Sequence, residues 1–443
     1  MSLRFSLFLI YFALASGIAS PLWAQAPANT GATSTFSASV PAAQLLQDDR
    51  SLARWVNDHS QQLAAARAEF QAASAARRNA RLLPNPVVDV QVSNLALGRT
   101  TPRGLGPDQT LIYGVGLSET VELGKRAPRI GAASLRAQAA GDRVLATLSD
   151  RVGYARFALA RLVYAEARAL QLDASLAQAE AAAQVAKGRL DHQALSGVDY
   201  DRLLIDLAGI RTEAAHAHAD AQAADAECAA TMLARCDVTE ASVGSLSPSA
   251  QLPKTWSDAD LARRADLKAL TLERDAARRD ADLASARAIP DLTFRLGYTH
   301  DSFTVSGDLG NSLALSVSAP LPVFDRGQHD KAQALAHADQ FERTAAGTFN
   351  HARGDVIGLF TRKRAIEGAL AMLEQDALPR ANGVLEAQER GLREGQLDIT
   401  DLLLARREAI ALRLQTLELH FELFTIRNDI RQALGLDEAL ASR

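Results

Sequence analysis

The sequence predicts a mainly α-helical chain that carries four β-strands and is built from two copies of one plan. Long stretches rich in Ala and Leu contain no cluster of Gly or Pro, as expected for long helices. Four segments alternate apolar residues with small or polar ones, which is the period of a β-strand. The same landmarks return about two hundred residues later, which indicates an internal repeat.

The N-terminus has the pattern of a targeting segment followed by an arm. Residues 1–26 combine Arg4, an apolar run and the small-residue site Ala24-Gln25-Ala26, which is typical of a secretory signal peptide cut after Ala26. An N-terminal membrane anchor is the alternative. No Cys follows the cleavage site, so no lipid anchor is expected there. Residues 27–45 are rich in Ala, Thr, Ser and Pro and predict a flexible arm.

The first repeat, 46–241, begins with a helical segment that Pro84-Asn85-Pro86 ends. A β-hairpin over 86–123 follows, and then a long helical hairpin that turns near 191–199. In the β-hairpin the apolar residues fall on one face of each strand. They are Val88, Val90 and Val92 in the first strand and Leu111, Tyr113, Val115 and Leu117 in the second.

The second repeat, 259–434, follows a linker at 242–258 that is rich in Ser, Gly and Pro. A helix comes first, then a β-hairpin over 290–325 and a long helical hairpin that turns near 392–401. Residues 435–443 form a C-terminal tail. The apolar faces of the two strands comprise Leu292, Phe294, Leu296 and Tyr298, and then Leu313, Leu315 and Val317.

Strands of this length with one apolar face suit a β-barrel that crosses a bilayer. A soluble hairpin packed on the helices fits the second hairpin equally well. Four strands cannot close a membrane barrel, and an open sheet would leave bare edges in lipid, so a membrane location requires several chains to join their strands. Three chains would supply twelve strands, and their long helices would pack as a coiled-coil barrel.

The two cysteines, Cys228 and Cys236, leave their redox state open. On one continuous helix they would lie roughly 12 Å apart along the axis, which is too far for a disulfide. A bridge therefore requires the helix to end between them. A disulfide and two free thiols are both consistent with the sequence.

The motifs around the strands and turns resemble the TolC family of outer-membrane efflux proteins, over essentially the entire mature chain. The resemblance is carried by Leu83-Pro84-Asn85-Pro86, by the run from Ser118 to Arg126 that ends in Glu122-Leu123-Gly124-Lys125-Arg126, and by the turn from Glu394 to Leu403. The first two elements are most similar to the CzcC-like, heavy-metal efflux branch.

The resemblance implies a homotrimer with a twelve-stranded barrel in the bacterial outer membrane and a helical tunnel in the periplasm. It also implies a periplasmic adaptor and a proton-driven inner-membrane pump as partners. Such a tunnel is a passive conduit rather than an enzyme, and it needs no cofactor.

Both helical turns place a helix N-cap residue three positions before an acid. Ser196 precedes Asp199, and Asp398 precedes Asp401. The pattern caps a helix, and in a trimer each acid would also recur around the tunnel mouth, where a ring of carboxylates attracts cations. The resemblance matches Asp401 to an aperture acid. We therefore expect a ring first at Asp401 and second at Asp199 or Asp201. The family's second aperture acid corresponds to Leu404 here.

The surface that meets an adaptor is expected at the same turns. Its predicted residues are Leu195, Gly197, Leu392, Gly395, Gln396 and Leu397. The alternative is that these residues only connect helices, and both roles are compatible.

Other function classes find little support. The 48 basic and 52 acidic side chains give a net charge of −4, so no basic excess indicates nucleic-acid binding. No nucleophile–base–acid set indicates an enzyme. His216, His218 and Asp220 do not share one helical face and make a poor metal site. Arg295 either lines a pore or pairs with an acid.

The function that the resemblance implies is the exit duct of a tripartite efflux pump, which passes metal cations or small toxic compounds from the periplasm to the exterior. One alternative is the exit duct of a type I protein secretion system. The other is a periplasmic coiled-coil scaffold without a pore.

Overall fold

A computed structural model of the chain describes residues 38–95, 110–239, 243–246, 252–302, 309–394 and 399–442. The predicted signal peptide, most of the arm, part of the linker and the turn residues 395–398 lie outside the described residues. The chain divides into the units Met1–Phe36 and Ser37–Arg443, and the description below concerns the second unit alone.

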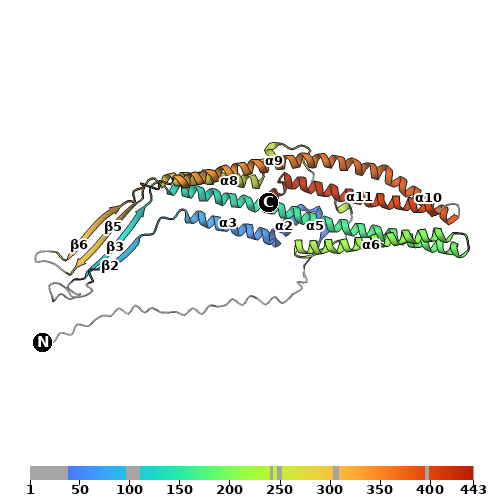
Figure 1. Cartoon of the computed structure of the whole chain (residues 1–443), viewed down its shortest axis with the longest axis horizontal. Helices are drawn as coiled ribbons and strands as arrows, with labels where there is room; N and C mark the ends of the chain where they lie inside the picture. The colour runs from blue at the N-terminus through green and yellow to red at the C-terminus, as the bar shows by residue number, and fades with distance from the viewer. Residues whose placement is uncertain are drawn as a thin grey trace, which may run out of the picture. The chain divides into compact units, whose positions relative to one another are not determined.

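The described elements run through a helix, a β-hairpin and a long helical hairpin, and then through the same series again (Figure 1). The first series comprises β1 (Ser39–Pro41), α1 (Ala42–Gln47), α2 (Asp49–His59), α3 (Gln61–Asn79), β2 (Val87–Ser93), β3 (Ile112–Val121), α5 (Arg126–Asp191), α6 (Gly197–Met232) and β4 (Arg235–Asp237). The second comprises η1 (Val243–Leu246), α7 (Asp258–Leu261), α8 (Ala265–Ala286), β5 (Leu292–Asp301), β6 (Asn311–Ser318), α9 (Gln328–Met372), η2 (Leu373–Ala377), α10 (Leu378–Glu394), α11 (Ile399–Ala433) and η3 (Leu436–Ser442). The predicted mainly helical fold with two β-hairpins is confirmed.

The first helical segment differs from the single helix that its sequence suggests. It is divided at Ser60, which has extended backbone and accepts a hydrogen bond on Oγ from the backbone N–H of Leu63 at 3.3 Å. The serine therefore ends α2 and caps α3. The short parallel pair of β1 with β4 was also not predicted.

The two hairpins join into one antiparallel sheet with the strand order β2-β3-β5-β6. Its register gathers the predicted apolar residues in rows on one face. Two of these rows are Val88–Leu117–Leu296–Leu315 and Val90–Val115–Tyr298–Leu313. All eight side chains are exposed, from 47% for Tyr298 to 76% for Leu315. The alternative of a soluble hairpin packed on the helices is therefore wrong, because no described helix covers this face.

The opposite face of the sheet is polar and carries an ion pair across three strands. Arg295 on β5 pairs with Asp89 on β2, so the predicted pairing with an acid is present, and a place on the lining of a pore stays a prediction. Gly116 on β3 lies between them. A Cβ at Gly116 would stand 2.6 Å from Asp89 Oδ1 and 2.8 Å from Arg295 Nε, so any larger residue would force these side chains to shift.

Two long helical runs leave the sheet. The helix α5 has 66 residues and is about 100 Å long at ~1.5 Å per residue. The second run passes from α9 through a π-helical turn at η2 into α10. Pro379 has no backbone N–H and its ring crowds the carbonyl one turn earlier, which accounts for a wider turn just before it. Gly327 begins α9 with a φ of 74°, where a side chain would clash with the backbone of Ala284.

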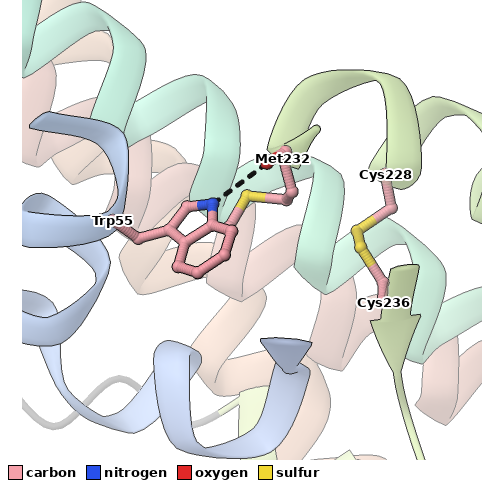
Figure 2. The surroundings of a disulfide bond; sticks show 4 residues. All are labelled: Trp55, Cys228, Met232 and Cys236. Atoms are coloured by element: carbon pink, nitrogen blue, oxygen red, sulfur yellow. Dashed lines mark hydrogen bonds between the residues drawn. A yellow bond between two sulfur atoms is a disulfide. The ribbon is translucent and has the colours of Figure 1, made fainter. Parts of the chain in front are cut away.

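The two cysteines are bridged just beyond the end of α6. The helix stops at Met232, Leu233 adopts the left-handed conformation, and Cys228 and Cys236 form a disulfide (Figure 2). Trp55 of α2 donates a hydrogen bond from Nε1 to the carbonyl oxygen of Met232 at 3.0 Å. These contacts fasten the end of α6 to β4 and to α2.

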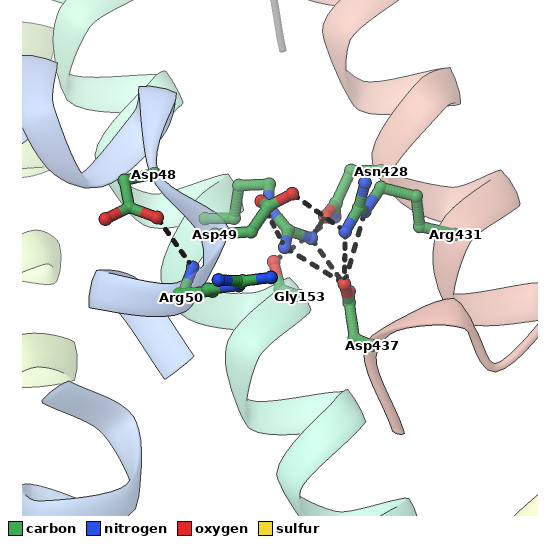
Figure 3. Close-up of polar contacts among 8 residues, drawn as sticks. Asp48, Asp49, Arg50, Gly153, Asn428, Arg431 and Asp437 are labelled. Carbon is green, nitrogen blue, oxygen red and sulfur yellow. Dashed lines mark hydrogen bonds and ion pairs between the residues drawn. The ribbon is translucent and has the colours of Figure 1, made fainter. Parts of the chain in front are cut away.

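A buried ion network ties the C-terminal segment to the helices (Figure 3). Arg156 of α5 and Arg431 of α11 both pair with Asp437, at 2.9 and 2.6 Å, and the Asp437 side chain is fully buried. Asp49 of α2 accepts from both arginines, and Asn428 accepts from Arg156. Burial alone would raise the pKa of the Asp437 carboxyl, but Arg156 and Arg431 outweigh it and hold that pKa below its ordinary value.

We expect Asp437→Ala to destabilise the protein by about 3 kcal/mol, because it leaves two buried guanidinium groups with fewer partners. Thermal or denaturant unfolding of the purified protein measures the loss. The matched control is Asp339→Ala, whose partner Arg343 is exposed, and it should cost at most about 1 kcal/mol. Equal losses in the two variants would contradict the assignment.

The same network has a defined pH dependence. The folded-state pKa of Asp437 is depressed, so its contribution is complete above the ordinary value of about 3.9 and is lost as the pH falls through the folded-state pKa. The difference in stability between the native protein and Asp437→Ala should therefore shrink as the pH is lowered below about 4.

Candidate functional site

The two helical turns, predicted separately from the two repeats, meet at one end of the helices (Figure 1). We call this region the tip, and it comprises the last turns of α5 and α10 and the first turns of α6 and α11. Its apolar side chains form the tip cluster, which consists of Ala183, Ala186, Leu203, Leu385, Leu392, Ile399, Leu402, Leu403 and Ala409. Arg202 Nη1 also reaches Thr400 Oγ1 at 3.5 Å, between the starts of α6 and α11. The tip is thus a four-helix bundle with a core of its own.

Ser196 begins α6 by hydrogen bonding in both directions with Asp199. Its Oγ accepts from the backbone N–H of Asp199 at 3.1 Å and donates to Asp199 Oδ2 at 2.7 Å. Asp199 Oδ1 also accepts from Arg202 at 3.3 Å. The Asp199 carboxylate is therefore committed to the helix start, where the positive end of the helix dipole favours it.

The other two predicted aperture acids lie at the same end of the bundle. Asp401 is exposed in the first turn of α11, and Asp201 is exposed in the first turns of α6. Leu404, at the position of the family's second acid, is 58% exposed. Among the described residues, Asp401 and Asp201 therefore have fewer side-chain partners than Asp199, which bonds to Ser196 and Arg202.

The predicted adaptor-contact residues are placed differently from one another. Gly197 is exposed, whereas Leu195 is half-buried and packs against the tip cluster. Leu392 is only 4% exposed, because it belongs to the core-facing stripe of α10 with Leu385. The residues Gly395, Gln396, Leu397 and Asp398 lie outside the described residues.

A groove of about 230 Å³ runs beside Leu392, between α5 and the second helical hairpin. Its lining consists of Gln178, Ala181, Ala182, Val185, Glu389, Leu392 and Leu402. Small and apolar side chains make up most of it. Leu392 therefore contributes to the floor of a groove rather than to a protruding surface.

Sequence analysis missed a layer of polar residues inside the tip. Arg406 of α11 is 2% exposed and Asp206 of α6 is 5% exposed, and Gln388 of α10 has a buried Oε1. Asp206 Oδ1 accepts from Arg407 Nε at 2.8 Å. Burial lowers the pKa of the Arg406 guanidinium, although Asp206 and Glu389 oppose that effect. The available signal was spacing, since Arg406 falls on the same helical stripe as Leu402, Leu403 and Ile410.

The weak histidine motif does not assemble a site. His218 pairs with Asp173 at 2.9 Å and Asp220 pairs with Arg168 at 3.1 Å. Within the described ranges, no three His, Cys, Asp or Glu side chains gather closely enough to hold a metal ion. None of the helices that the structure describes is long and apolar enough to cross a membrane.

Comparison with known proteins gives consistent results. Residues 256–436 match the family of outer membrane efflux proteins. The cobalt-zinc-cadmium resistance protein CzcC of Cupriavidus metallidurans is 24% identical over 427 residues, covering 95% of this chain and 98% of that protein.

Solved structures of outer-membrane channels share the fold. A structure of CusC aligns with a TM-score of 0.73 and 15% identity, covering 87% of this chain and 91% of that one. The Campylobacter jejuni CmeC outer membrane channel aligns with a TM-score of 0.72 and 14% identity, covering 90% and 89%. The predicted resemblance and fold are thereby confirmed.

Ser196→Ala should loosen the start of α6, because it removes the side-chain acceptor for an otherwise unpaired backbone N–H. Loss of such a cap costs about 1 kcal/mol. Hydrogen exchange of the amides in the first turns of α6 should accelerate by about fivefold, as that energy implies. Ser196→Asp, which keeps a capping oxygen, serves as the control and should exchange nearly as slowly as the native protein. Equal acceleration in both variants would contradict the capping role.

Proposed function

We propose that this chain belongs to the outer membrane efflux protein family, forms the exit duct of a tripartite efflux pump and passively conducts its cargo from the periplasm to the exterior. The fold of an outer-membrane channel and the relationship to CzcC over nearly the entire chain support the proposal. A leader at residues 1–26 would direct the chain through the secretory route.

One observation carries this proposal: the sheet of a single chain is incomplete. Among the described residues, β2 pairs only with β3 and β6 pairs only with β5, so each outer strand has one unpaired edge. One face is apolar and exposed. In lipid, unpaired backbone groups are costly, and the only strand arrangement without edges is a closed one. Three copies that join β6 to β2 would close a twelve-stranded barrel with its apolar face outward.

Two observations indicate the cargo: the name of the related protein CzcC and the exposed carboxylates at the tip. CzcC is named for resistance to cobalt, zinc and cadmium, so divalent metal cations are the first candidate cargo. In a homotrimer, Asp401 and Asp201 would each occur three times around the mouth of the tip. Rings of carboxylates raise the local concentration of cations without binding them tightly. Small toxic compounds are the other candidate cargo.

Two features of the tip, a groove and an exposed turn, suit the binding of a partner protein. A periplasmic adaptor, linked to an inner-membrane pump, would place apolar side chains in the groove beside Leu392 and contact the exposed turn at Gly197. Helical segments often dock in this way, with small groups of apolar side chains lying in a complementary groove.

The assembly is tested with the full chain expressed in a Gram-negative host. We expect it to resist a carbonate wash of the membranes and to run in detergent at three times the mass of one chain by light scattering. The detergent-purified protein should conduct ions in planar bilayers. A carbonate-soluble protein or a stable monomer in detergent would contradict the proposal and would favour a periplasmic scaffold.

Asp401→Ala should lower the preference for cations, because it removes a ring of three charges at the narrow end. It should raise the single-channel conductance, because it also removes the bridges to neighbouring helices by which such a ring can hold the aperture shut. Each carboxylate at ~10 Å in water contributes about 0.4 kcal/mol to the energy of a cation, which is about twofold in local concentration. Reversal potentials in salt gradients measure the preference. Asp58→Ala on α2 removes the same charge outside the tip and should change neither value. An unchanged conductance and reversal potential in Asp401→Ala would refute the role.

A further inference from the structure

Large apolar side chains are exposed at both edges of the sheet, just where the outer strands meet the helices. The entry segment, residues 80–86, leads from α3 into β2, and the exit segment, residues 319–327, leads from β6 into α9. Five large apolar side chains of these segments are more than half exposed, namely Leu82, Leu83, Leu321, Val323 and Phe324. Such a group of exposed apolar side chains marks a surface that another molecule covers.

Hydrogen bonds from α5 hold the main chain of the entry segment. Arg129 donates from Nε to the carbonyl oxygen of Ala80 at 3.1 Å and from Nη2 to that of Leu82 at 3.2 Å. Arg126 Nη2 donates to the carbonyl oxygen of Arg81 at 3.1 Å. The backbone is thereby fastened to α5 while the two leucine side chains of the segment stay exposed.

The exit segment is held by bonds close to its own end. Asp325 Oδ1 accepts from the backbone N–H of Gly327 at 2.8 Å, and Gln328 Nε2 donates to the carbonyl oxygen of Phe324 at 3.2 Å. Gly327 also lies against the backbone of Ala284 in α8. Phe324 is 92% exposed, more than any other large apolar side chain that the structure describes. A large aromatic side chain is therefore displayed in solvent on a fixed backbone.

The two segments also carry exposed charges of opposite sign. Arg81 is exposed, and its guanidinium has no carboxylate partner within the part of the chain that the structure describes. Asp325 is exposed as well, and among the described residues its carboxylate bonds to a backbone N–H but to no cation. Arg326, its neighbour, donates instead to the carbonyl oxygen of Pro322 at 3.3 Å. Each segment thus offers one charge that a partner of opposite sign can meet.

The position of the two segments indicates what covers them. They adjoin β2 and β6, the outer strands of the sheet, which the structure shows with unpaired edges among the described residues. The inner connections are joined within the chain, where Lys125 pairs with Asp291 at 2.7 Å. If β6 of one copy lies beside β2 of the next, about 4.8 Å away, the exit segment of the first copy comes beside the entry segment of the second. Repeated head to tail, such a contact closes a ring of copies.

We propose that the exit segment of one copy packs on the entry segment of the next, so that Phe324 contacts Leu82 and Leu83. Asp325 of the first copy then pairs with Arg81 of the second. The contact rests on the trimer proposed above and specifies which side chains join its copies outside the strands. Because the segments continue directly into α3 and α9, it couples closure of the sheet to the joining of the helices.

A cross-link between copies tests this contact in the full chain purified in detergent. Leu83→Cys combined with Phe324→Cys should give covalent dimers and trimers on non-reducing gels after mild oxidation. Within one chain these residues lie at opposite edges of the sheet, three strand spacings or about 14 Å apart, which is too far for a disulfide. The native cysteines, Cys228 and Cys236, are buried and bridged to each other, so they do not compete.

The matched control is Ile289→Cys combined with Phe324→Cys. Ile289 is also exposed, but it lies on an inner connection, so this pair should give no covalent dimer or trimer. Light scattering of the native protein separates the possible failures. A trimer that Leu83→Cys with Phe324→Cys does not cross-link would overturn the contact and leave the channel proposal intact, whereas a native monomer would contradict both.

A charge exchange tests the ion pair. Asp325→Arg should raise the dissociation constant of the trimer about tenfold, because it places like charges together three times in the ring. Adding Arg81→Asp to the same chain should restore the native value, which a variant that merely folds poorly would not show. Failure of the second substitution to restore association would count against the pairing.

Lipid is the other molecule that could cover these side chains, and it gives a different result. Phe324→Trp in vesicles of brominated phosphatidylcholine should be quenched much less than Val90→Trp, which lies on the exposed apolar face of the sheet. The fluorescence of the native protein is subtracted from both. Equal quenching of the two tryptophans would show that lipid covers Phe324 and would overturn the proposal.

Discussion

The architecture of this chain depends on a sheet whose outer strands, among the described residues, leave backbone hydrogen-bonding groups unpaired. The backbone N–H and C=O groups of a strand must find partners, and this requirement becomes strict where water is excluded. The register of β2, β3, β5 and β6 aligns apolar residues on one face and small or polar residues on the other. The sheet therefore has an apolar face, a polar face and, among the described residues, two unpaired edges. Subunit joining is a condition for placing this fold in a membrane.

The long helices also cannot bury their apolar side chains on their own. A helix as long as α5 cannot be covered by one compact core, so its stability depends on continuous contact with other helices along its length. Alanine dominates its buried positions and lets the neighbouring helices approach closely. The disulfide at the end of α6 and the ion network around Asp437 fix the middle of the bundle, where several short elements meet. The sheet, whose outer strands have unpaired edges among the described residues, lies outside this fixed region.

The sequence predicted those features that follow from periodicity and from short motifs. Alternation placed Val88 and Val90 on one face of β2, and Leu313 and Leu315 on one face of β6, because that pattern is local to each strand. The repeat placed the two turns at one end. Features that depend on which segments meet were not predictable. The partner of Arg295 required the register of three strands, and the disulfide required a helix end at Leu233 that no glycine or proline marks.

In the tip, the sequence predicted the cap at Ser196 because it lies within four residues. It did not reveal Arg406, because a lone arginine on an apolar stripe looks the same as an exposed one until the neighbouring helices are placed. The burial of Asp206 was hidden for the same reason, since three turns of α6 separate it from the cap.

Two buried arginines, Arg156 and Arg406, have opposite effects on the stability of the regions around them. Arg156 bonds to Asp437, Asp49 and Asn428, which compensates most of the cost of burying its charge and locks four segments together. Arg406 is equally buried but lacks such partners among the described residues. A fold that needed only rigidity at the tip would place leucine at that position, as it does one turn earlier at Leu402 and Leu403. An uncompensated charge at Arg406 therefore makes the core of the tip less stable than an apolar side chain would.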